Sequence, residues 1–384
     1  MKLIALYLPQ FHTIPENDKW WGEGFTEWVN VKKAAPLFDG HRQPRVPLKD
    51  NYYDLSDVEV MRWQTEIAKK YGIYGFCFYH YWFNGKLLLE KPVEKFLNAK
   101  EIDFHYCISW ANEHWTNQWV SDKWDVLIEQ TYGNREEWKK HFMYLLPFFR
   151  DSRYIRYKEK PVFLIYKPEL IEKRREMLEY WDELAREEGF KGLCFIFQRA
   201  EILLNNSETD LSMFDYCAQY QPGYAVAKYQ KEKQRFQSIR RLKRNILLYL
   251  SRHFKFDPRS IVLTPQGRGP RTDDYDFFWE RILSDDDAFP KTIPTAFVDW
   301  DNTPRRHERG SVMVGASPEK YKSYLKRLIN KSRNCYETDM IFIFAWNEWA
   351  EGGYLEPDNF NGYKYLEATR EALMETEEYP CFTD

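Results

Sequence analysis

Long apolar runs and a surplus of charge of either sign are missing from this 384-residue chain. Because no stretch of about 18 apolar residues occurs, we expect no transmembrane helix. Lys and Arg total 56 against 59 Asp and Glu, so the net charge of −3 excludes a general nucleic-acid binder. The apolar start ends at Pro9 without a small-residue cleavage site, which is typical of a first strand rather than a signal peptide. These absences predict a cytoplasmic protein with no nucleic-acid partner.

Motifs for metals and dinucleotides are also missing. The six cysteines include no CxxC pair and the eight histidines include no HExxH motif, so we predict neither a metal site nor a cofactor. No GxGxxG follows the first predicted strand, which disfavours a dinucleotide-binding open sheet.

Aromatic residues are abundant, with 27 Phe, 27 Tyr and 15 Trp making up 18% of the chain. Trp is seldom fully buried, so core packing alone rarely requires so many indoles. Flat aromatic faces suit the apolar faces of sugar rings, and the composition therefore favours a carbohydrate site. An aromatic-rich core is the alternative explanation.

Eight short apolar runs are predicted to form strands, and most of them are continuous rather than alternating, as in a parallel sheet covered on both faces. They are Leu3–Leu8, Tyr74–Tyr79, Phe104–Trp110, Val162–Tyr166, Leu193–Gln198, Phe214–Tyr220, Thr295–Trp300 and Met340–Trp346. Helical patterns lie between them, including Asp57–Tyr71 with Ser56 as N-cap, Glu169–Glu188, and Ser317–Asn330. We predict an α/β fold, a (β/α)8 TIM barrel forming a single domain over residues 1–384 with long βα loops; a doubly wound open sheet is the main alternative.

Active sites of such barrels lie at the carboxyl ends of the strands. Polar side chains mixed with aromatic ones follow almost every predicted strand, as a sugar-binding cleft requires. The predicted substrate-binding residues are Gln10, His12, Glu27, Trp28, Tyr79, His80, Tyr81, Trp110, Asn112, Glu113, Tyr166, Asp301, Trp346 and Asn347. Strand ends are generally more polar than strand middles, which explains some of these residues but not the Trp and Tyr among them. For Glu27 an anchoring role in its loop, and for Asp301 a turn cap, are equally good interpretations.

One segment carries most of the positive charge. Residues 228–259 contain eleven Lys or Arg against Glu232 and Asp257. We predict a basic amphipathic helical insertion over residues 226–260, with Arg240, Arg241, Lys243 and Arg244 opposite an apolar face. Such a helix suits an anionic membrane surface, which would make the protein peripheral to the inner membrane. A helix on the outer wall of the barrel with a solvated basic face is the simpler alternative.

Two glutamates follow the last predicted strand, in Trp346-Asn347-Glu348-Trp349-Ala350-Glu351. In a helical turn, residues three apart project to one side, so both carboxylates can face one substrate. Two carboxylates with separated pKa values are the minimum equipment for cleaving a glycosidic bond. We predict that Glu348 and Glu351 are catalytic.

At these residues the chain resembles the glycosyltransferase WbsX family, which is related to glycoside hydrolase family 99, the endo-α-mannosidases. The motifs that carry the resemblance span nearly the whole chain: Tyr7–His12, Pro15–Asp18, Trp20–Gly22, Gly24–Trp28, Gly40-His41, Gly72–Gly75, Tyr79–Gly85, Trp110–Glu113, Trp300–Pro304, Trp346–Gly352 and Leu355–Pro357. The resemblance implies a (β/α)8 barrel with a metal-free carbohydrate-active site.

The resemblance also implies a mechanism. Glu348 would deprotonate the 2-hydroxyl of the sugar, which would then form a 1,2-anhydro intermediate, while Glu351 would act as general acid and later as the base that activates water. This implies a retaining glycoside hydrolase or transglycosidase acting on α-mannoside-like linkages of bacterial polysaccharide. A glycosyltransferase of surface polysaccharide (O-antigen or capsule) biosynthesis is the alternative, and a non-catalytic glycan-binding barrel is disfavoured because binding needs no such glutamate pair.

Overall fold

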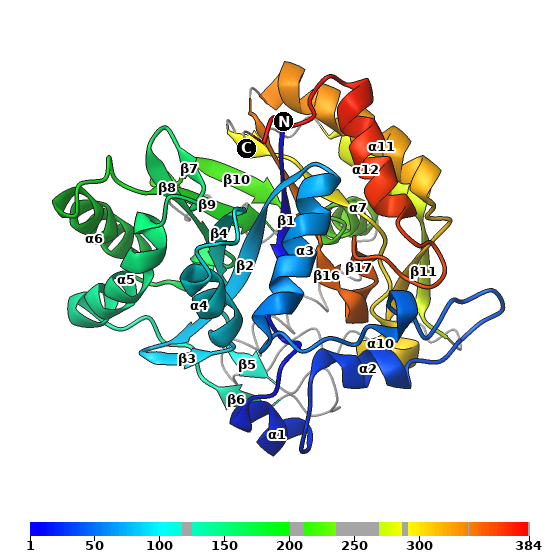
Figure 1. Ribbon diagram of the computed structural model, residues 1–384, viewed down its shortest axis with the longest axis horizontal. Helices are drawn as coiled ribbons and strands as arrows, with labels where there is room; N and C mark the ends of the chain where they lie inside the picture. The colour runs from blue at the N-terminus through cyan, green and yellow to red at the C-terminus, as the bar shows by residue number, and fades with distance from the viewer. Residues whose placement is uncertain (117–124, 200–210, 236–268, 286–290, 337, 383–384) are drawn as a thin grey trace.

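In a computed structural model of the protein, parallel strands close into a barrel with helices on its outside (Figure 1). The structure describes residues 1–116, 125–199, 211–235, 269–285, 291–336 and 338–382. The barrel strands are β1 (Lys2–Tyr7), β2 (Ile73–Phe83), β4 (His105–Trp110), β8 (Lys160–Ile165), β9 (Cys194–Arg199), β10 (Tyr216–Gln219), β12 (Thr292–Ile293), β13 (Thr295–Phe297) and β15 (Met340–Phe344). The predicted (β/α)8 barrel is confirmed, and two short strands, β12 and β13, together occupy the seventh of its eight strand positions.

The ring closes through the seventh strand position, which Pro294 divides into β12 and β13. β12 pairs with β10 on one side, and β13 pairs with β15 on the other, both in parallel. Proline has no N–H to give to a ladder, so the strand is interrupted there. The Pro294 carbonyl still accepts a hydrogen bond from the Phe342 amide at 3.1 Å, which keeps the two halves aligned on β15.

The strands are buried along most of their length, as their continuous apolar sequences predict. Every residue of β15 is at most 1% exposed, and Leu3 to Tyr7 of β1 are equally covered. Side chains of such strands pack alternately into the barrel interior and against the outer helices.

The outer helices are α3 (Val58–Lys70), α4 (Lys91–Asn98), α5 (Arg135–Arg150), α6 (Arg174–Glu187), α7 (Gly223–Arg235), α9 (Tyr275–Ser284), α11 (Pro318–Lys331) and α12 (Lys364–Glu375). Ser317 caps α11 as predicted, accepting a hydrogen bond from the Lys320 amide. The cap of α3 is Asp57 rather than Ser56, because the Asp57 side chain accepts from the Glu59 amide. The predicted helix at Glu169 begins later, at Arg174, after a short 3-10 turn at Pro168–Leu170.

Short elements gather where the strands end, around α1, α2 and α10 in Figure 1. They are α1 (Pro15–Trp21), α2 (Glu27–Lys33), η1 (Leu48–Asp50), β3 (Lys86–Leu88), β5 (Trp115–Thr116), β6 (Val126–Ile128), β11 (Arg271–Asp274), α10 (Thr303–Arg306), η5 (His307–Arg309), β14 (Ser311–Val314), β16 (Asn347–Glu348), η7 (Trp349–Glu351) and β17 (Gly353–Tyr354). β7 (Arg156–Tyr157) and η6 (Ser332–Tyr336) lie elsewhere along the chain. The predicted long βα loops are therefore built from ordered turns that carry the candidate site.

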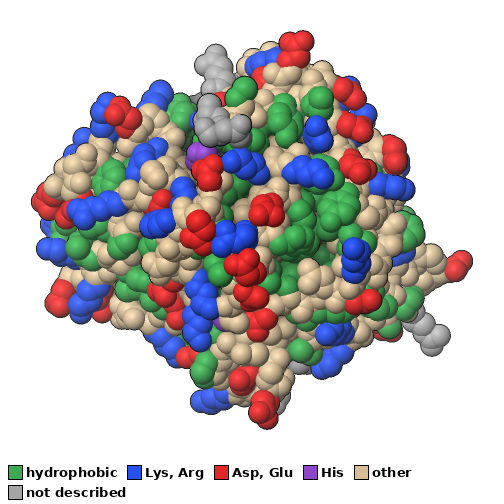
Figure 2. Space-filling model, viewed as in Figure 1, with side chains coloured by type: hydrophobic (Ala, Val, Ile, Leu, Met, Phe, Trp, Pro, Cys, Tyr) green, Lys and Arg blue, Asp and Glu red, His purple; other side chains and the backbone are tan. Residues whose placement is uncertain are grey.

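α7 covers only the start of the predicted basic insertion at 226–260. Residues 236–260, with Arg240, Arg241, Lys243 and Arg244, lie outside the described residues, so the insertion and its membrane contact stay predictions. On the face of the molecule in Figure 2, basic and acidic side chains are interspersed. None of the helices in the described part of the chain is long and apolar enough to cross a membrane.

Candidate active site

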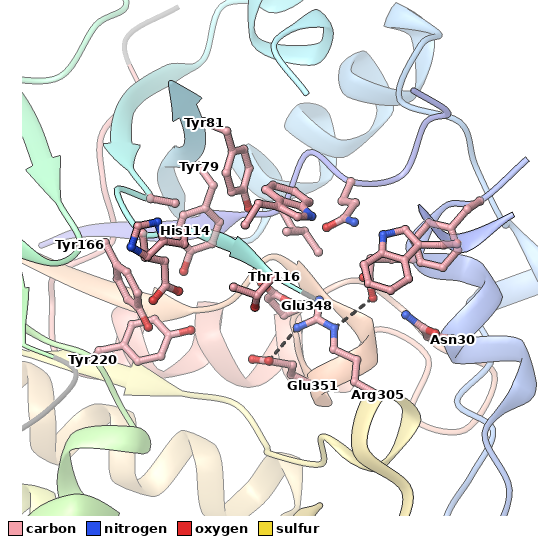
Figure 3. A pocket seen from close by; sticks show the side chains of 18 residues that line it. Asn30, Tyr79, Tyr81, His114, Thr116, Tyr166, Tyr220, Arg305, Glu348 and Glu351 are labelled. Atoms are coloured by element: carbon pink, nitrogen blue, oxygen red, sulfur yellow. Dashed lines mark hydrogen bonds and ion pairs between the residues drawn. The ribbon is translucent and has the colours of Figure 1, made fainter. Parts of the chain in front are cut away.

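A cavity of about 1020 Å³, measured out to its open mouth, lies among the loops at the carboxyl ends of the strands. Its walls combine aromatic rings with carboxylates and one guanidinium (Figure 3). The lining residues are Leu8, Gln10, Trp21, Phe25, Glu27, Asn30, Tyr79, Tyr81, Ala111, Glu113, His114, Trp115, Thr116, Tyr166, Tyr220, Arg305, Glu348 and Glu351.

Arg305 of α10 contacts three carboxylates in this cavity. Its Nη1 donates to Glu351 Oε1 at 2.6 Å, its Nη2 to Glu348 Oε2 at 3.2 Å, and its Nε to Glu27 Oε2 at 3.1 Å. The Arg305 side chain is 8% exposed, and its three partners are also buried. One guanidinium thus gathers side chains from α2, β16 and η7 at the floor of the cavity (Figure 3).

Burial raises the pKa of Glu348 to about 8. Loss of solvation disfavours the charged carboxylate, and the nearby Glu351 and Glu27 act in the same direction. The Arg305 guanidinium opposes this shift without cancelling it. A carboxyl group with a pKa near neutrality is well matched to proton transfer at physiological pH.

The turn formed by β16 and η7 directs the side chains of Glu348 and Glu351 toward the same part of the cavity. Glu348 ends β16, and η7 carries the chain through one 3-10 turn to Glu351, so residues three apart project to the same side. Gly352 follows with φ +68°, a conformation that favours glycine, and turns the chain into β17. Glu348 pairs with Gly353 across the resulting hairpin. The predicted projection of both carboxylates to one side is thus reproduced, in a 3-10 turn.

Asn347 ties this hairpin to the first strand of the barrel. Its Oδ1 accepts from the Leu8 amide at 2.8 Å, and its Nδ2 donates to the Leu8 carbonyl at 3.0 Å. Because side chains alternate along a strand, Asn347 faces the barrel wall while Glu348 faces the cavity. This pair of hydrogen bonds fixes the direction in which Glu348 points.

Glu356 holds the turn from its other side. Its Oε2 accepts from Trp349 Nε1 at 2.6 Å and from the Tyr53 hydroxyl at 2.8 Å, and its Oε1 accepts from Gln64 Nε2 at 2.6 Å. The Trp349 ring also stacks on Tyr354, with ring centroids 3.8 Å apart. Burial raises the pKa of Glu356 to about 7, although these hydrogen bonds act in the opposite direction.

Tyrosines cover the opposite wall of the cavity. Tyr79 and Tyr81 come from β2, and Tyr166 and Tyr220 follow β8 and β10 (Figure 3). Burial raises the pKa of Tyr79, Tyr81 and Tyr220 above its usual range, so these hydroxyls stay protonated and can donate hydrogen bonds.

His114 offers a further donor, because its Nδ1 accepts a hydrogen bond from the Gln130 amide at 2.9 Å. In the neutral ring, this leaves the proton on Nε2. Glu113, beside it, pairs with Lys167 Nζ at 2.5 Å.

Eight of the predicted site residues line the cavity: Gln10, Glu27, Tyr79, Tyr81, Glu113, Tyr166, Glu348 and Glu351. The other eight do not line it. They are His12, Trp28, His80, Trp110, Asn112, Asp301, Trp346 and Asn347.

Most of this second group support the loops from behind. Asn112 binds both the amide and the carbonyl of Lys167, each at 2.7 Å. Asp301 accepts from Gln43 at 2.6 Å and lies 2.9 Å from His41 Nε2. Trp28 Nε1 donates to the Tyr53 carbonyl at 2.8 Å, and His12 Nδ1 lies 2.9 Å from the Pro9 carbonyl.

Asn347 was described above, and the last three residues of this group are buried in the wall of the barrel. His80 Nε2 lies 2.8 Å from His141 Nε2, and burial lowers the pKa of His80 to about 3, so its ring is neutral. Trp110 Nε1 donates to the Trp82 carbonyl at 3.3 Å. Trp346 packs against Phe76, with ring centroids 4.9 Å apart.

Sequence reasoning missed Arg305, the residue on which three carboxylates converge. It directly follows the Trp300–Pro304 motif, so its position beside a candidate carboxylate, Asp301, is the signal that could have found it. Leu8, Trp21, Phe25, Asn30, Ala111, His114, Trp115, Thr116 and Tyr220 were also missed as lining residues, although Leu8, Trp21, Phe25 and Ala111 lie inside the motifs.

No group of three or more His, Cys, Asp or Glu side chains in the described ranges is arranged to hold a metal ion. At the point where Glu27, Glu348 and Glu351 converge, the positive charge is the guanidinium of Arg305.

The fold defines a class of protein, the (β/α)8 TIM barrels. The chain is similar in fold to a GH99 endo-α-mannosidase from Bacteroides thetaiotaomicron solved in complex with bis-tris-propane, with a TM-score of 0.56 and 16% identity, covering 98% of this chain and 97% of that one. A structure described as a glycoside hydrolase-like protein gives a TM-score of 0.58 at 11% identity, covering 97% of this chain and 93% of that one.

The chain belongs to the glycosyltransferase WbsX family, whose model matches residues 3–369. An uncharacterized protein WxcX of Xanthomonas campestris pv. campestris (strain B100) is 35% identical over 376 residues, which cover 97% of this chain and 49% of that relative. A second strain of the same organism has a WxcX protein that is 34% identical. The chain spans about half the length of these curated relatives. Family and fold together point to a carbohydrate-active enzyme.

The raised pKa of Glu356 predicts a pH-dependent stability. Between its usual pKa of 4.5 and its folded value of about 7, the unfolded chain releases the Glu356 proton and the folded chain keeps it. The free energy of unfolding should therefore fall as pH rises through this window, by on the order of 3 kcal/mol from this group.

Urea unfolding of the wild type and Glu356→Gln at pH 4.5, 6 and 7.5 checks this expectation. The variant should lose less stability over this range than the wild type. Because Glu348 titrates in both proteins, its contribution cancels in the comparison. Parallel pH dependences would contradict a raised pKa at Glu356.

Proposed function

We propose that the protein is a retaining glycosidase or transglycosidase that acts on α-mannoside-like linkages of bacterial polysaccharide through a 1,2-anhydrosugar intermediate. The observation that carries this proposal is the presence of Glu348 and Glu351 in one tyrosine-lined cavity, both on the guanidinium of Arg305. The resemblance to family 99 supplies the assignment of roles, and the geometry supports it by giving two carboxylates of one turn different surroundings.

In the first step, Glu348 accepts the proton of the sugar 2-hydroxyl. The freed oxygen attacks the anomeric carbon, the glycosidic bond breaks, and Glu351 gives a proton to the leaving oxygen. In the second step, Glu351 takes a proton from water, whose oxygen attacks the anomeric carbon. The three-membered ring then opens, and its oxygen recovers the proton from Glu348.

The pKa of about 8 suits Glu348 to this role. A hydroxyl group is a weak acid, so a carboxylate of high proton affinity removes its proton more effectively than an ordinary one. The Arg305 guanidinium and the tyrosine hydroxyls supply fixed dipoles where charge develops, and the buried site strengthens their effect.

Nucleotide-sugar transfer is the second candidate, and the name of the family model favours it. Arg305 is the only Lys or Arg among the described lining residues of the cavity, and carboxylates already contact its three nitrogens. A sugar diphosphate would therefore meet mostly negative charge there. This observation supports hydrolysis or transglycosylation.

Glycan release from α-mannosidic bacterial polysaccharides, measured without nucleotide sugar, tests the proposal. The wild type should release product, and Glu351→Gln should be at least about 100-fold slower on natural glycans because the leaving oxygen receives no proton. Product formed only when a nucleotide sugar is supplied would establish the transferase instead.

A 2-deoxy analogue of any substrate found in this way should be inert, because it lacks the hydroxyl that closes the ring. Product release from the analogue is followed for at least 100 times the half-time of product release from the natural sugar. Loss of the base-catalysed step slows a reaction by about 100-fold or more, so this period is long enough to detect it. The control is that the analogue binds the enzyme, which is measured by its competitive inhibition of turnover of the natural substrate. Turnover of the analogue would exclude the 1,2-anhydro route.

Activated aryl glycosides separate the roles of the two glutamates, because their leaving groups need no acid. They should restore the first step, release of the aryl group, in Glu351→Gln but not in Glu348→Gln, whereas the second step still lacks its base in Glu351→Gln. In Glu351→Gln, kcat/KM should rise with pH and level off at or below about 8, because the base must be ionised and the loss of Glu351 removes a charge that raises its pKa. If activated aryl glycosides restored activity in Glu348→Gln, or if kcat/KM fell with rising pH in Glu351→Gln, Glu348 would be the acid and Glu351 the base.

A further inference from the structure

Three buried carboxylates share one guanidinium, and the proposed chemistry uses only two of them. Glu27, on α2, is the third, and it is 4% exposed. A single positive charge cannot pair fully with three negative ones in a region of low solvation. The way in which Arg305 divides its hydrogen bonds therefore decides how each carboxylate is stabilised.

The Arg305 guanidinium divides its hydrogen bonds unevenly among the three carboxylates. Its Nε and Nη2 groups form one edge, on which a single carboxylate can accept two parallel hydrogen bonds, the strongest form of this pair. Here Glu27 takes Nε at 3.1 Å and Glu348 takes Nη2 at 3.2 Å, so each has half of the edge. Glu351 takes Nη1 at 2.6 Å. Of the three contacts, that of Glu348 is the longest, and it uses only half of the edge.

The backbone of Glu27 is held in place independently of Arg305. Its amide donates to the Gln10 carbonyl at 3.1 Å, three residues past the end of β1. The next residue, Trp28, packs on Trp349 of η7, with ring centroids 5.5 Å apart. α2 and η7 therefore keep Glu27 at a set distance from the glutamate pair.

We propose that Glu27 is a positioning residue which, by occupying Arg305 Nε, restricts Glu348 to one contact with the guanidinium and so preserves the proton affinity of Glu348. The inference rests on the proposed function in taking Glu348 as the base. Without Glu27, the Nε and Nη2 edge would be open to Glu348, which would bind it with both oxygens and become a weaker base.

The other groups that face Glu348 do not replace Glu27 in this role. Glu351 comes from η7 and holds Nη1, while Tyr79 and Tyr81 on β2 and Tyr220 after β10 present neutral hydroxyls. Among the described residues around Glu348, Glu27 is the carboxylate that shares its edge of the guanidinium.

The test is a titration of the Glu348 carboxyl group by its carbon-13 resonance, assigned through its loss in Glu348→Gln. In Glu27→Gln the midpoint should move to lower pH by about one unit or more, because a negative charge is removed and Arg305 turns toward Glu348. The amide has nearly the size and shape of the carboxylate, so the fold is retained, but its neutral oxygen holds Nε less strongly than a carboxylate does. Glu113→Gln is the matched control: it removes a carboxylate from the same cavity that binds Lys167 instead, and the midpoint should stay in place.

Kinetics give a second readout. On an activated aryl glycoside, adding Glu27→Gln to Glu351→Gln should shift the rise of kcat/KM to lower pH and lower its plateau by about 3-fold or more, as expected for a weaker base. A Glu348 midpoint that is unchanged or raised in Glu27→Gln overturns the proposal. The titration needs no turnover, so a wild type that releases no glycan would refute the proposed function and leave this result to stand on its own.

Discussion

The arrangement of the site depends on the burial of the Arg305 guanidinium among Glu27, Glu348 and Glu351. Burying a guanidinium and three carboxyl groups away from water is costly, and hydrogen bonds to all three guanidinium nitrogens offset much of that cost. The charges do not balance, since three carboxylates face one cation. Burial raises the pKa of Glu348 to about 8, and the nearby Glu351 and Glu27 add to this shift while Arg305 opposes it.

The barrel brings these groups together from distant parts of the chain. Glu27 follows the first strand, Arg305 the seventh, and Glu348 and Glu351 the eighth, and these strands are neighbours because β1 and β13 both pair with β15. Parallel pairing places all three strand ends at the same end of the barrel. The loops then need only short turns, such as α2, α10 and η7, to deliver the side chains.

Around this charged centre, a second layer of polar contacts sets the direction of each side chain. Asn347 binds Leu8, Asn112 binds Lys167, and Glu356 binds Trp349, so the turns that carry Glu348, Glu113 and Glu351 are held by buried hydrogen bonds. Such bonds are costly to leave unmade in the interior, which makes the turn geometry specific. The tyrosine wall opposite the carboxylates supplies hydroxyl donors and ring faces on the scale of a sugar unit.

The sequence by itself determined the barrel, its eight strands and the turn that carries Glu348 and Glu351, because continuous apolar runs and residue spacing are local properties of the chain. Which side of a strand end faces the cavity was decided by the tertiary structure. Tyr79 and Tyr81 line the cavity while His80 between them contacts His141, and Glu348 faces it while Asn347 contacts Leu8. Side chains alternate along a strand, but only the closed barrel fixes which half of the alternation points inward. The three carboxylate contacts of Arg305 were decided by the tertiary structure, because its partners lie 278, 46 and 43 residues away along the chain.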